Sequence, residues 1–545
     1  MSAPVLLDAG VVTRCRRRVH LEHDPAMAGA PRSMPDPTAE RRIADAAAHR
    51  RAVADRLARL LGADWAEVPA GATPAERLAA TSALLTAGTR FIWGGALPLD
   101  PDSGRRGAVE LLSRVNGGYL PVIVVRHKVT DPGAGASTSP IAELDPRHAR
   151  VDPDRRVRPH TRDQLRLAHA LRMLQAAGLA APDRPVGGVI GLDADVVVWH
   201  DLGAPTWPGG RSALTEYDLR FADRMAVATA ALTGGEPLAK PSRVTECRSC
   251  PWWVLCEREL RGERDVSLVL RGEDAVALRA VGLSTVDKLA ACEPTDEPPV
   301  PLAGMPFADA VLLARAWLAD LTLVRRVPEV EVPRADVELD VDMESFGDSG
   351  AYLWGCHLSG ADIGLPRGYR PFVTWQPLPT IDEARSFAAF WTFLSTVRAR
   401  AAARGLGFRA FCYNELAENR WLVASAQRFA GRPGIPTVEA VTDFIVSSAW
   451  VDLFGVVNRQ FLCAHGKGLK TIAPAAGFAW RDAEAGGENS MRWYRQAVGL
   501  DGDPVDPGQR ERLLVYNEDD VLATWTLRRW MSSPDVLAVP YARDL

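Results

Sequence analysis

The stretch ADVELDVDMESF, residues 335–346, alternates acidic and apolar side chains. In a β-strand successive side chains point to opposite faces, so this pattern predicts a strand with all of its carboxylates on one face. The five acids are Asp336, Glu338, Asp340, Asp342 and Glu344. Carboxylates this close repel one another unless solvent or cations relieve the repulsion. The segment is therefore either a solvated edge strand or part of a cation-binding site.

Two later motifs favour the cation-binding interpretation. Asn414 ends the stretch GFRAFCYN, and Glu418 follows it with the spacing N-x-x-x-E. Tyr516 and Asp520 lie at the predicted start of the last helix with the spacing Y-x-x-x-D. Residues 335–532 thus resemble the RNase H-like 3'-to-5' exonucleases of the DEDD group. Their motifs are D-x-E, N-x-x-x-D and Y-x-x-x-D, so Glu418 departs from the group, in which an aspartate is expected.

This resemblance implies a two-metal nuclease site in an RNase H-like α/β domain. Such a site holds two Mg²⁺ or Mn²⁺ ions ~4 Å apart, one to generate hydroxide and one to stabilise the leaving oxygen. The implied metal ligands and catalytic residues are Asp342, Glu344, Glu418 and Asp520, with Tyr516 orienting the attacking water. The two lysines of HGKGLKTIA, Lys467 and Lys470, are candidates for contacts with DNA phosphates.

A second feature is the cysteine-rich stretch VTECRSCPWWVLCERE, which contains Cys247, Cys250 and Cys256. Structural zinc sites are usually built from two close cysteine pairs, and disulfides are disfavoured in the cytoplasm. Cys15 lies in RCRRRVH, a basic context that favours a thiolate, and is the best candidate for a fourth ligand. Four thiolates suit an iron–sulfur cluster, while zinc and unliganded thiols remain the alternatives.

A remote cysteine followed by C-x2-C-x5-C resembles the 4Fe-4S staple of RecB-like nucleases, which have the PD-(D/E)XK fold. The resemblance covers residues 10–260 and implies a site at His20, Glu110, Lys128 and Gln164. Arg126 stands where the second acid is expected, and Ala168 replaces a tyrosine. Because Mg²⁺ needs carboxylate oxygens, Arg126 predicts a degenerate site whose fold is kept while its chemistry is weakened or lost.

The length of 545 residues exceeds what one hydrophobic core usually serves. We predict a RecB-like α/β domain with the iron–sulfur cluster at 1–262, a helical connector of helix-hairpin-helix type at 263–330 that turns at Gly282, and an RNase H-like α/β domain at 331–545. Amphipathic periodicity predicts helices at 38–62 and 73–87. The Pro, Gly and Ser content of 131–159 predicts a loop.

The two resemblances in one chain look like bacterial RecB-like nucleases with an RNase H-like C-terminus. The net charge of −4 restricts nucleic-acid binding to local patches, such as Arg14 and 16–18, although a charge run is more often a solvated surface. No apolar run is long enough for a membrane helix and no secretory pattern opens the chain, so we expect a cytoplasmic protein without membrane contacts.

We therefore expect a metal-dependent DNA nuclease, a 3'-to-5' exonuclease of DNA repair or recombination, with RNA as an open alternative substrate. The sequence lacks a G-x-x-x-x-G-K-[ST] loop, so unwinding would need a helicase in trans. The alternative function is a catalytically inactive iron–sulfur scaffold that binds DNA and recruits such a helicase.

Overall fold

The structure is a computed structural model that describes residues 5–34, 37–500, 502 and 504–545. The chain divides into two compact units, Met1–Leu260 and Arg261–Leu545. The second unit includes both the predicted connector and the predicted C-terminal domain, and their separation into two domains stays a prediction. Within the described residues, no helix combines the length and hydropathy that crossing a bilayer requires.

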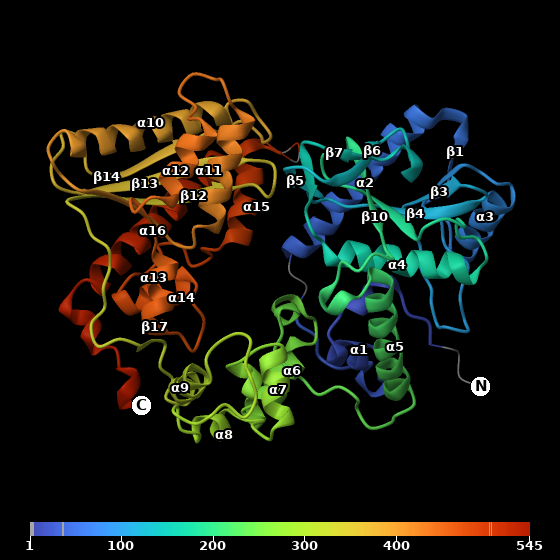
Figure 1. Cartoon of the computed structure of the whole chain (residues 1–545), viewed down its shortest axis with the longest axis horizontal. Helices are drawn as coiled ribbons and strands as arrows, with labels where there is room; N and C mark the ends of the chain where they lie inside the picture. The colour runs from blue at the N-terminus through green and yellow to red at the C-terminus, as the bar shows by residue number, and fades with distance from the viewer. Residues whose placement is uncertain (1–4, 35–36, 501, 503) are drawn as a thin grey trace. The chain divides into compact units, whose positions relative to one another are not determined.

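The first unit is built around a mixed eight-stranded sheet in the order β1-β2-β3-β4-β9-β10-β6-β7 (Figure 1). These strands are β1 (Trp65–Glu67), β2 (Phe91–Trp93), β3 (Leu111–Val115), β4 (Gly118–Val124), β6 (Ala136–Pro140), β7 (Arg150–Asp152), β9 (Val186–Ile190) and β10 (Val196–Asp201). The helices are α1 (Arg16–His23), α2 (Pro37–Leu61), α3 (Pro74–Thr86), α4 (Thr161–Ala176), α5 (Ala213–Leu232) and α6 (Trp253–Glu263).

Helices cover both faces of this sheet, so its strands carry apolar side chains on both sides. On one face α4 packs against β4 and β9, and α5 packs against α4 and α1. On the other face Val53 and Leu57 of α2 share a core with Leu111 and Val122. The predicted helices at 38–62 and 73–87 are confirmed as α2 and α3.

The prediction of a loop over 131–159 was wrong. Residues of this segment form β6 and β7 at the edge of the main sheet and the pair β5 (Thr130–Pro132) and β8 (Arg155–Val157). Composition misled the prediction because hydroxyl side chains here have tertiary partners: Ser139 Oγ accepts a hydrogen bond from Trp199 Nε1 at 2.9 Å. Pairing with β10 therefore overrides a local preference for turns.

The second unit begins with short helices: α7 (Glu273–Ala280), α8 (Val286–Ala290) and α9 (Phe307–Leu318). The chain turns between α7 and α8 at Gly282, whose φ of 88° lies in the left-handed region that glycine adopts without steric cost. The predicted helical hairpin is therefore present.

The rest of this unit surrounds a five-stranded sheet in the order β14-β13-β12-β15-β16. The strands are β12 (Val337–Ser345), β13 (Ala351–Gly360), β14 (Gly368–Val373), β15 (Phe408–Cys412) and β16 (Trp450–Asp452), and β11 (Val324–Arg325) pairs with β17 (Phe461–Leu462) elsewhere. The helices are α10 (Glu383–Ala402), α11 (Leu416–Arg428), α12 (Val438–Val446), α13 (Leu453–Gln460), α14 (Leu469–Ile472), α15 (Gly487–Val498) and α16 (Pro507–Met531).

The acidic strand is β12, and it is a central strand, paired antiparallel with β13 and parallel with β15. This excludes a solvated edge strand. Val337, Leu339 and Val341 on its apolar face share a core with Phe387 and Phe390 of α10. The acidic face is instead covered by α16, and Figure 1 shows α10 and α16 on opposite sides of the sheet.

Helix α16 begins at Pro507, earlier than the sequence predicts. Asp506 caps it by accepting a hydrogen bond from the backbone N–H of Gly508, and Pro507 occupies the first helical turn, where a proline loses no hydrogen bond. Tyr516 and Asp520 therefore lie in the middle of a 25-residue helix and one turn apart. This spacing directs both side chains to the same helix face.

Candidate functional site

The acidic face of β12 has two halves with different partners. In the first half, the fully buried Arg528 of α16 donates to both carboxylate oxygens of Asp340, each at 2.7 Å, and also to Glu338. Arg334 donates to Glu338 as well. The first of the five acids, Asp336, accepts from the backbone N–H of Gly407. The repulsion expected from the sequence is relieved here by arginine, which makes this half a structural ion-pair network.

In the second half, Asp342 and Glu344 meet Asp520 of α16. One carboxylate oxygen from each of the three lies within 4.8 Å of the others. Burial raises the pKa of Glu344 to about 8, and the negative charge of Asp520 adds to this rise. Burial and the charges of Asp520, Glu344 and Glu418 also raise the pKa of Asp342 well above its usual range. Three carboxylates that resist ionisation together, two of them buried and Asp342 half-buried, are a donor set suited to hard divalent cations.

Glu418 lies beside this trio. It belongs to the first turn of α11, is buried, and its Oε2 atom has no hydrogen-bond partner within the described part of the chain. Burial raises its pKa to about 8, and its charge in turn raises the pKa values of Asp342 and Glu344. An unsatisfied buried carboxylate oxygen fits a cation ligand, although Glu418 lies outside the group within 4.8 Å.

The nearest alternative acid, Asp452, has other partners. Its carboxylate accepts hydrogen bonds from the backbone N–H groups of Asn414 and Phe454, both at 2.9 Å, and caps α13. Asn414 itself has a φ of 69°, a conformation that asparagine tolerates better than most residues. Asp452 therefore holds the loop from which α11 and Glu418 start.

Lys470, predicted to contact phosphates, lies in the acidic site. Its Nζ donates to the hydroxyl of Tyr516 at 2.9 Å and is 3.8 Å from Asp520 Oδ2. Its positive charge opposes the rise in the pKa of Asp342 and Glu344. Lys467, the second predicted lysine, donates instead to Asn458.

Several residues that hold the carboxylates escaped the sequence analysis. Asn517 Nδ2 donates to Asp342 Oδ2 at 2.7 Å, and Tyr369 holds the Asn517 amide by donating to its Oδ1 at 2.7 Å. Gly355 of β13 lies opposite Asp342, where an added Cβ would be 1.7 Å from Asn517 Oδ1. A glycine at this position makes room for the amide.

The other two carboxylates are held in the same way. Trp480 Nε1 donates to Asp520 Oδ1 at 2.6 Å, and Ser490 Oγ donates to Glu344 Oε2 at 3.2 Å. Of these donors only Asn517 was adjacent to a recognised motif, in YNEDD. Trp480 and Ser490 lie in a connecting segment and on α15, and no local pattern marks them.

In the first unit, the four predicted cysteine ligands line one pocket. Cys15 precedes α1, the other three come from the segment around α6, and Trp252 and Trp253 line the same pocket. Burial raises the pKa of Cys250 to about 11 and that of Cys256 to about 12, so these thiols are neutral without a bound metal. Among the described residues, no three of these sulfur atoms lie within 4.8 Å of one another, whereas tetrahedral zinc would hold them ~3.8 Å apart.

The residues of the predicted RecB-like site each have a different partner. Glu110 Oε1 accepts from Arg166 at 2.8 Å, and Gln164 Oε1 accepts from Trp207 Nε1 at 2.9 Å. Arg126, at the position of the missing acid, forms an ion pair with Asp45. Buried His20 has its Nε2 atom 3.7 Å from Asp24. Lys128 contributes its backbone carbonyl to a hydrogen bond with His160.

The basic run at the start of α1, Arg14 and residues 16–18, is largely neutralised. Arg14 and Arg18 pair with Glu22, and Arg18 also pairs with Glu246. Arg16 pairs with Asp223, and Arg17 with Glu259. These contacts fasten α1 to α5 and to the cysteine-rich segment, which weakens the case for phosphate binding at this patch.

Comparison with known proteins identifies part of the second unit. Residues 428–532 match a family model of the RNase H superfamily. This range begins at Arg428, the last residue of α11, and includes Lys470, Tyr516 and Asp520. It does not include Asp342, Glu344 or Glu418. No curated protein and no solved structure matches the chain. The second unit thus contains an RNase H-like α/β domain, a fold typical of nucleases that use divalent metals.

Proposed function

We propose that this protein is a metal-dependent DNA nuclease and that its second unit cleaves DNA as a 3'-to-5' exonuclease, in repair or recombination. The observation that carries the proposal is the convergence of Asp342, Glu344 and Asp520 in an RNase H-like domain. Beside them lies Glu418, whose Oε2 atom has no hydrogen-bond partner among the described residues. Arg528 balances the neighbouring acids Glu338 and Asp340, whereas at the trio the nearest ion pair that the described residues form is the 3.8 Å contact of Lys470 with Asp520.

The carboxylates would hold two Mg²⁺ or Mn²⁺ ions, which when bound supply an activated water and stabilise the leaving oxygen. Asn517, Trp480 and Ser490 fix the orientation of the oxygens that they hydrogen-bond, as the partners of metal ligands commonly do. The Tyr516 oxygen accepts from Lys470, so the proton of its own hydroxyl is available to Asp520 or to a water at the site.

For the first unit we propose a 4Fe-4S cluster held by Cys15, Cys247, Cys250 and Cys256. Support comes from the common pocket of the four thiols and from the suitability of four thiolates as ligands of such a cluster. A cluster there would fasten α1 to the segment that precedes α6, which closes a long loop of the chain. In this proposal the first unit keeps a degenerate RecB-like fold and binds DNA, and a helicase acts in trans.

The test uses the purified full chain with single-stranded DNA labelled at either end, and a matched RNA, in the presence of Mg²⁺ or Mn²⁺. We expect stepwise shortening from the 3' end. Asp342→Asn and Asp520→Asn should lower the rate by about two to four powers of ten, or ~3–5 kcal/mol, with DNA binding retained. Asp443→Asn, an exposed acid on α12, is the matched control and should cleave like the wild type.

Glu418 is tested separately, since a longer acid replaces the expected aspartate. Glu418→Gln should be severely impaired, and Glu418→Asp should change activity or the preference between Mg²⁺ and Mn²⁺. Wild-type cleavage by both variants would remove Glu418 from the site. If the wild type binds DNA and cleaves neither DNA nor RNA, the scaffold function replaces the nuclease.

A further inference from the structure

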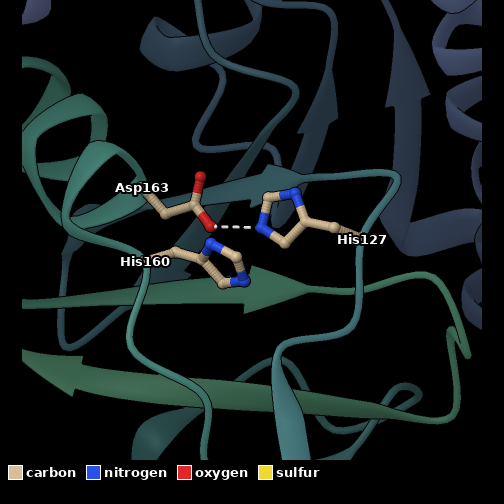
Figure 2. A group of neighbouring side chains, drawn as sticks. All are labelled: His127, His160 and Asp163. Carbon is tan, nitrogen blue, oxygen red and sulfur yellow. Dashed lines mark hydrogen bonds and ion pairs between the residues drawn. The ribbon is translucent and has the colours of Figure 1, made fainter. Parts of the chain in front are cut away.

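A second group of metal-ligating side chains lies in the first unit, apart from the thiols. It consists of His127, His160 and Asp163, each with one donor atom within 4.8 Å of the others (Figure 2). His127 follows β4, His160 directly precedes α4, and Asp163 belongs to the first turn of α4. The carboxylate is buried, while both imidazoles are half-buried. The fold thus brings two histidines from separate segments to one buried acid.

The hydrogen bonds of this group direct two nitrogen atoms at the carboxylate. His127 Nε2 lies 2.8 Å from Asp163 Oδ2. His160 uses its Nε2 atom for the backbone carbonyl of Lys128, at 3.2 Å. An N–H donated to that carbonyl leaves the lone pair on Nδ1, and Figure 2 shows this nitrogen facing Asp163 and His127.

This arrangement has a place for a positive charge beside the carboxylate, which either a second proton on His160 or a metal ion supplies. A lone pair on His160 Nδ1 and a carboxylate oxygen repel each other, and no hydrogen bond joins these two atoms among the described residues. The imidazole rings of His127 and His160 are 3.9 Å apart between centroids, so both edges crowd the same carboxylate. Histidines that ligate metals commonly donate their other N–H to a backbone carbonyl, as His160 does.

We propose that His127, His160 and Asp163 bind a divalent transition metal, Zn²⁺ in the first place, with an open fourth position for water. Two imidazoles and one carboxylate match the mixed nitrogen and oxygen ligands of zinc sites that keep one position free. Metal–ligand bonds of about 2.0–2.2 Å place tetrahedral ligand atoms ~3.4 Å apart. Metal binding would therefore lengthen the 2.8 Å distance between His127 Nε2 and Asp163 Oδ2 by well under 1 Å. The metal takes the place of the shared proton, which is released to solvent.

The site is distinct from the Mg²⁺ site that a RecB-like nuclease would need. Glu110 is engaged by Arg166 and the second acid is replaced by Arg126, which disfavours a hard cation at those positions. The histidine site borders the lysine and glutamine of that predicted site in the chain, since His127 directly precedes Lys128 and Asp163 directly precedes Gln164. The bland alternative is a His–Asp hydrogen bond that fastens the segment after β4 to α4.

The proposal is tested by Zn²⁺ and Co²⁺ binding to the full-length protein, stripped of loosely held metal, at fixed pH. The wild type should hold one more equivalent of tightly bound Zn²⁺ than His127→Ala or Asp163→Asn. The Co²⁺ difference spectrum between wild type and variant should show tetrahedral ligand-field bands without thiolate charge transfer, which separates this site from the cysteines. Loss of a ligand should weaken binding by more than the ~100-fold that an outer partner costs.

His148→Ala is the matched control, an exposed histidine of the same unit that pairs with Glu143. It should bind metal like the wild type. Asp163→Asn keeps the size of the side chain and decides the question if His127→Ala fails to fold. Equal Zn²⁺ stoichiometry and affinity in wild type and Asp163→Asn would overturn the proposal. The group would then be a structural hydrogen bond between His127 and Asp163. Nuclease activity is not the readout, so the outcome is independent of the proposed function.

Discussion

Replacement of Arg528 by methionine should destabilise the second unit strongly. Both members of the Arg528–Asp340 pair have side chains that are 0% exposed, and Arg528 also bonds to Glu338. Glu338 keeps Arg334 in the variant, whereas Asp340 loses the guanidinium that contacts both of its oxygens. Removing one partner of a buried ion pair costs about 3–5 kcal/mol, because the other charge stays buried without compensation.

The loss should depend on pH in a definite direction. Burial raises the pKa of Asp340, and Arg528 is the main opposing influence, so the substitution raises this pKa further. A carboxyl whose pKa is raised by folding stabilises the fold below its unfolded pKa, about 3.9, and loses that stability as pH rises. The variant should therefore be close to the wild type near pH 4 and increasingly less stable towards pH 8.

Calorimetry measures the Tm of the second unit. The two units need not unfold together, so the transition of the second unit must be resolved from that of the first. For a unit of this size the loss corresponds to a decrease in Tm of roughly 6–20 °C. Arg529→Met is the control, an exposed neighbour that stacks over Trp525. If Arg528→Met lowers the Tm near pH 7.5 no more than Arg529→Met does, the ion-pair reasoning fails.

Three further outcomes are expected. Mn²⁺ binding, measured by calorimetric titration, should weaken about 50-fold from pH 8 to pH 6, because a pKa of about 8 leaves Glu344 half-protonated at pH 8 and almost fully protonated at pH 6, and the metal must displace this proton; affinity independent of pH would contradict this. Protein purified without oxygen should be brown and contain iron and sulfide, and Cys15→Ala should lose the colour as fully as Cys250→Ala; colourless protein with one tight zinc ion argues against the cluster. Lys128→Ala should keep most nuclease activity, and complete loss in a folded variant would show that the RecB-like site is active.

Several features of this protein follow from short stretches of sequence, because backbone periodicity acts over a few residues. The alternation in ADVELDVDMESF determined a strand with acids on one face, and β12 has this arrangement. Amphipathic spacing likewise located α2 and α3. The four cysteines that the sequence selected line one pocket, and the cluster that they would hold stays a prediction.

The tertiary structure alone decided which partner each of these groups meets. Identical spacing along β12 cannot distinguish Asp340, paired with an arginine 188 residues away, from Asp342, which meets the amide of Asn517 175 residues away. The strands within 131–159 depend on pairing with β10, and the approach of His127 to Asp163 depends on how α4 packs against β4. Such contacts form only when distant elements pack together, and the energy that selects them is absent from any local pattern.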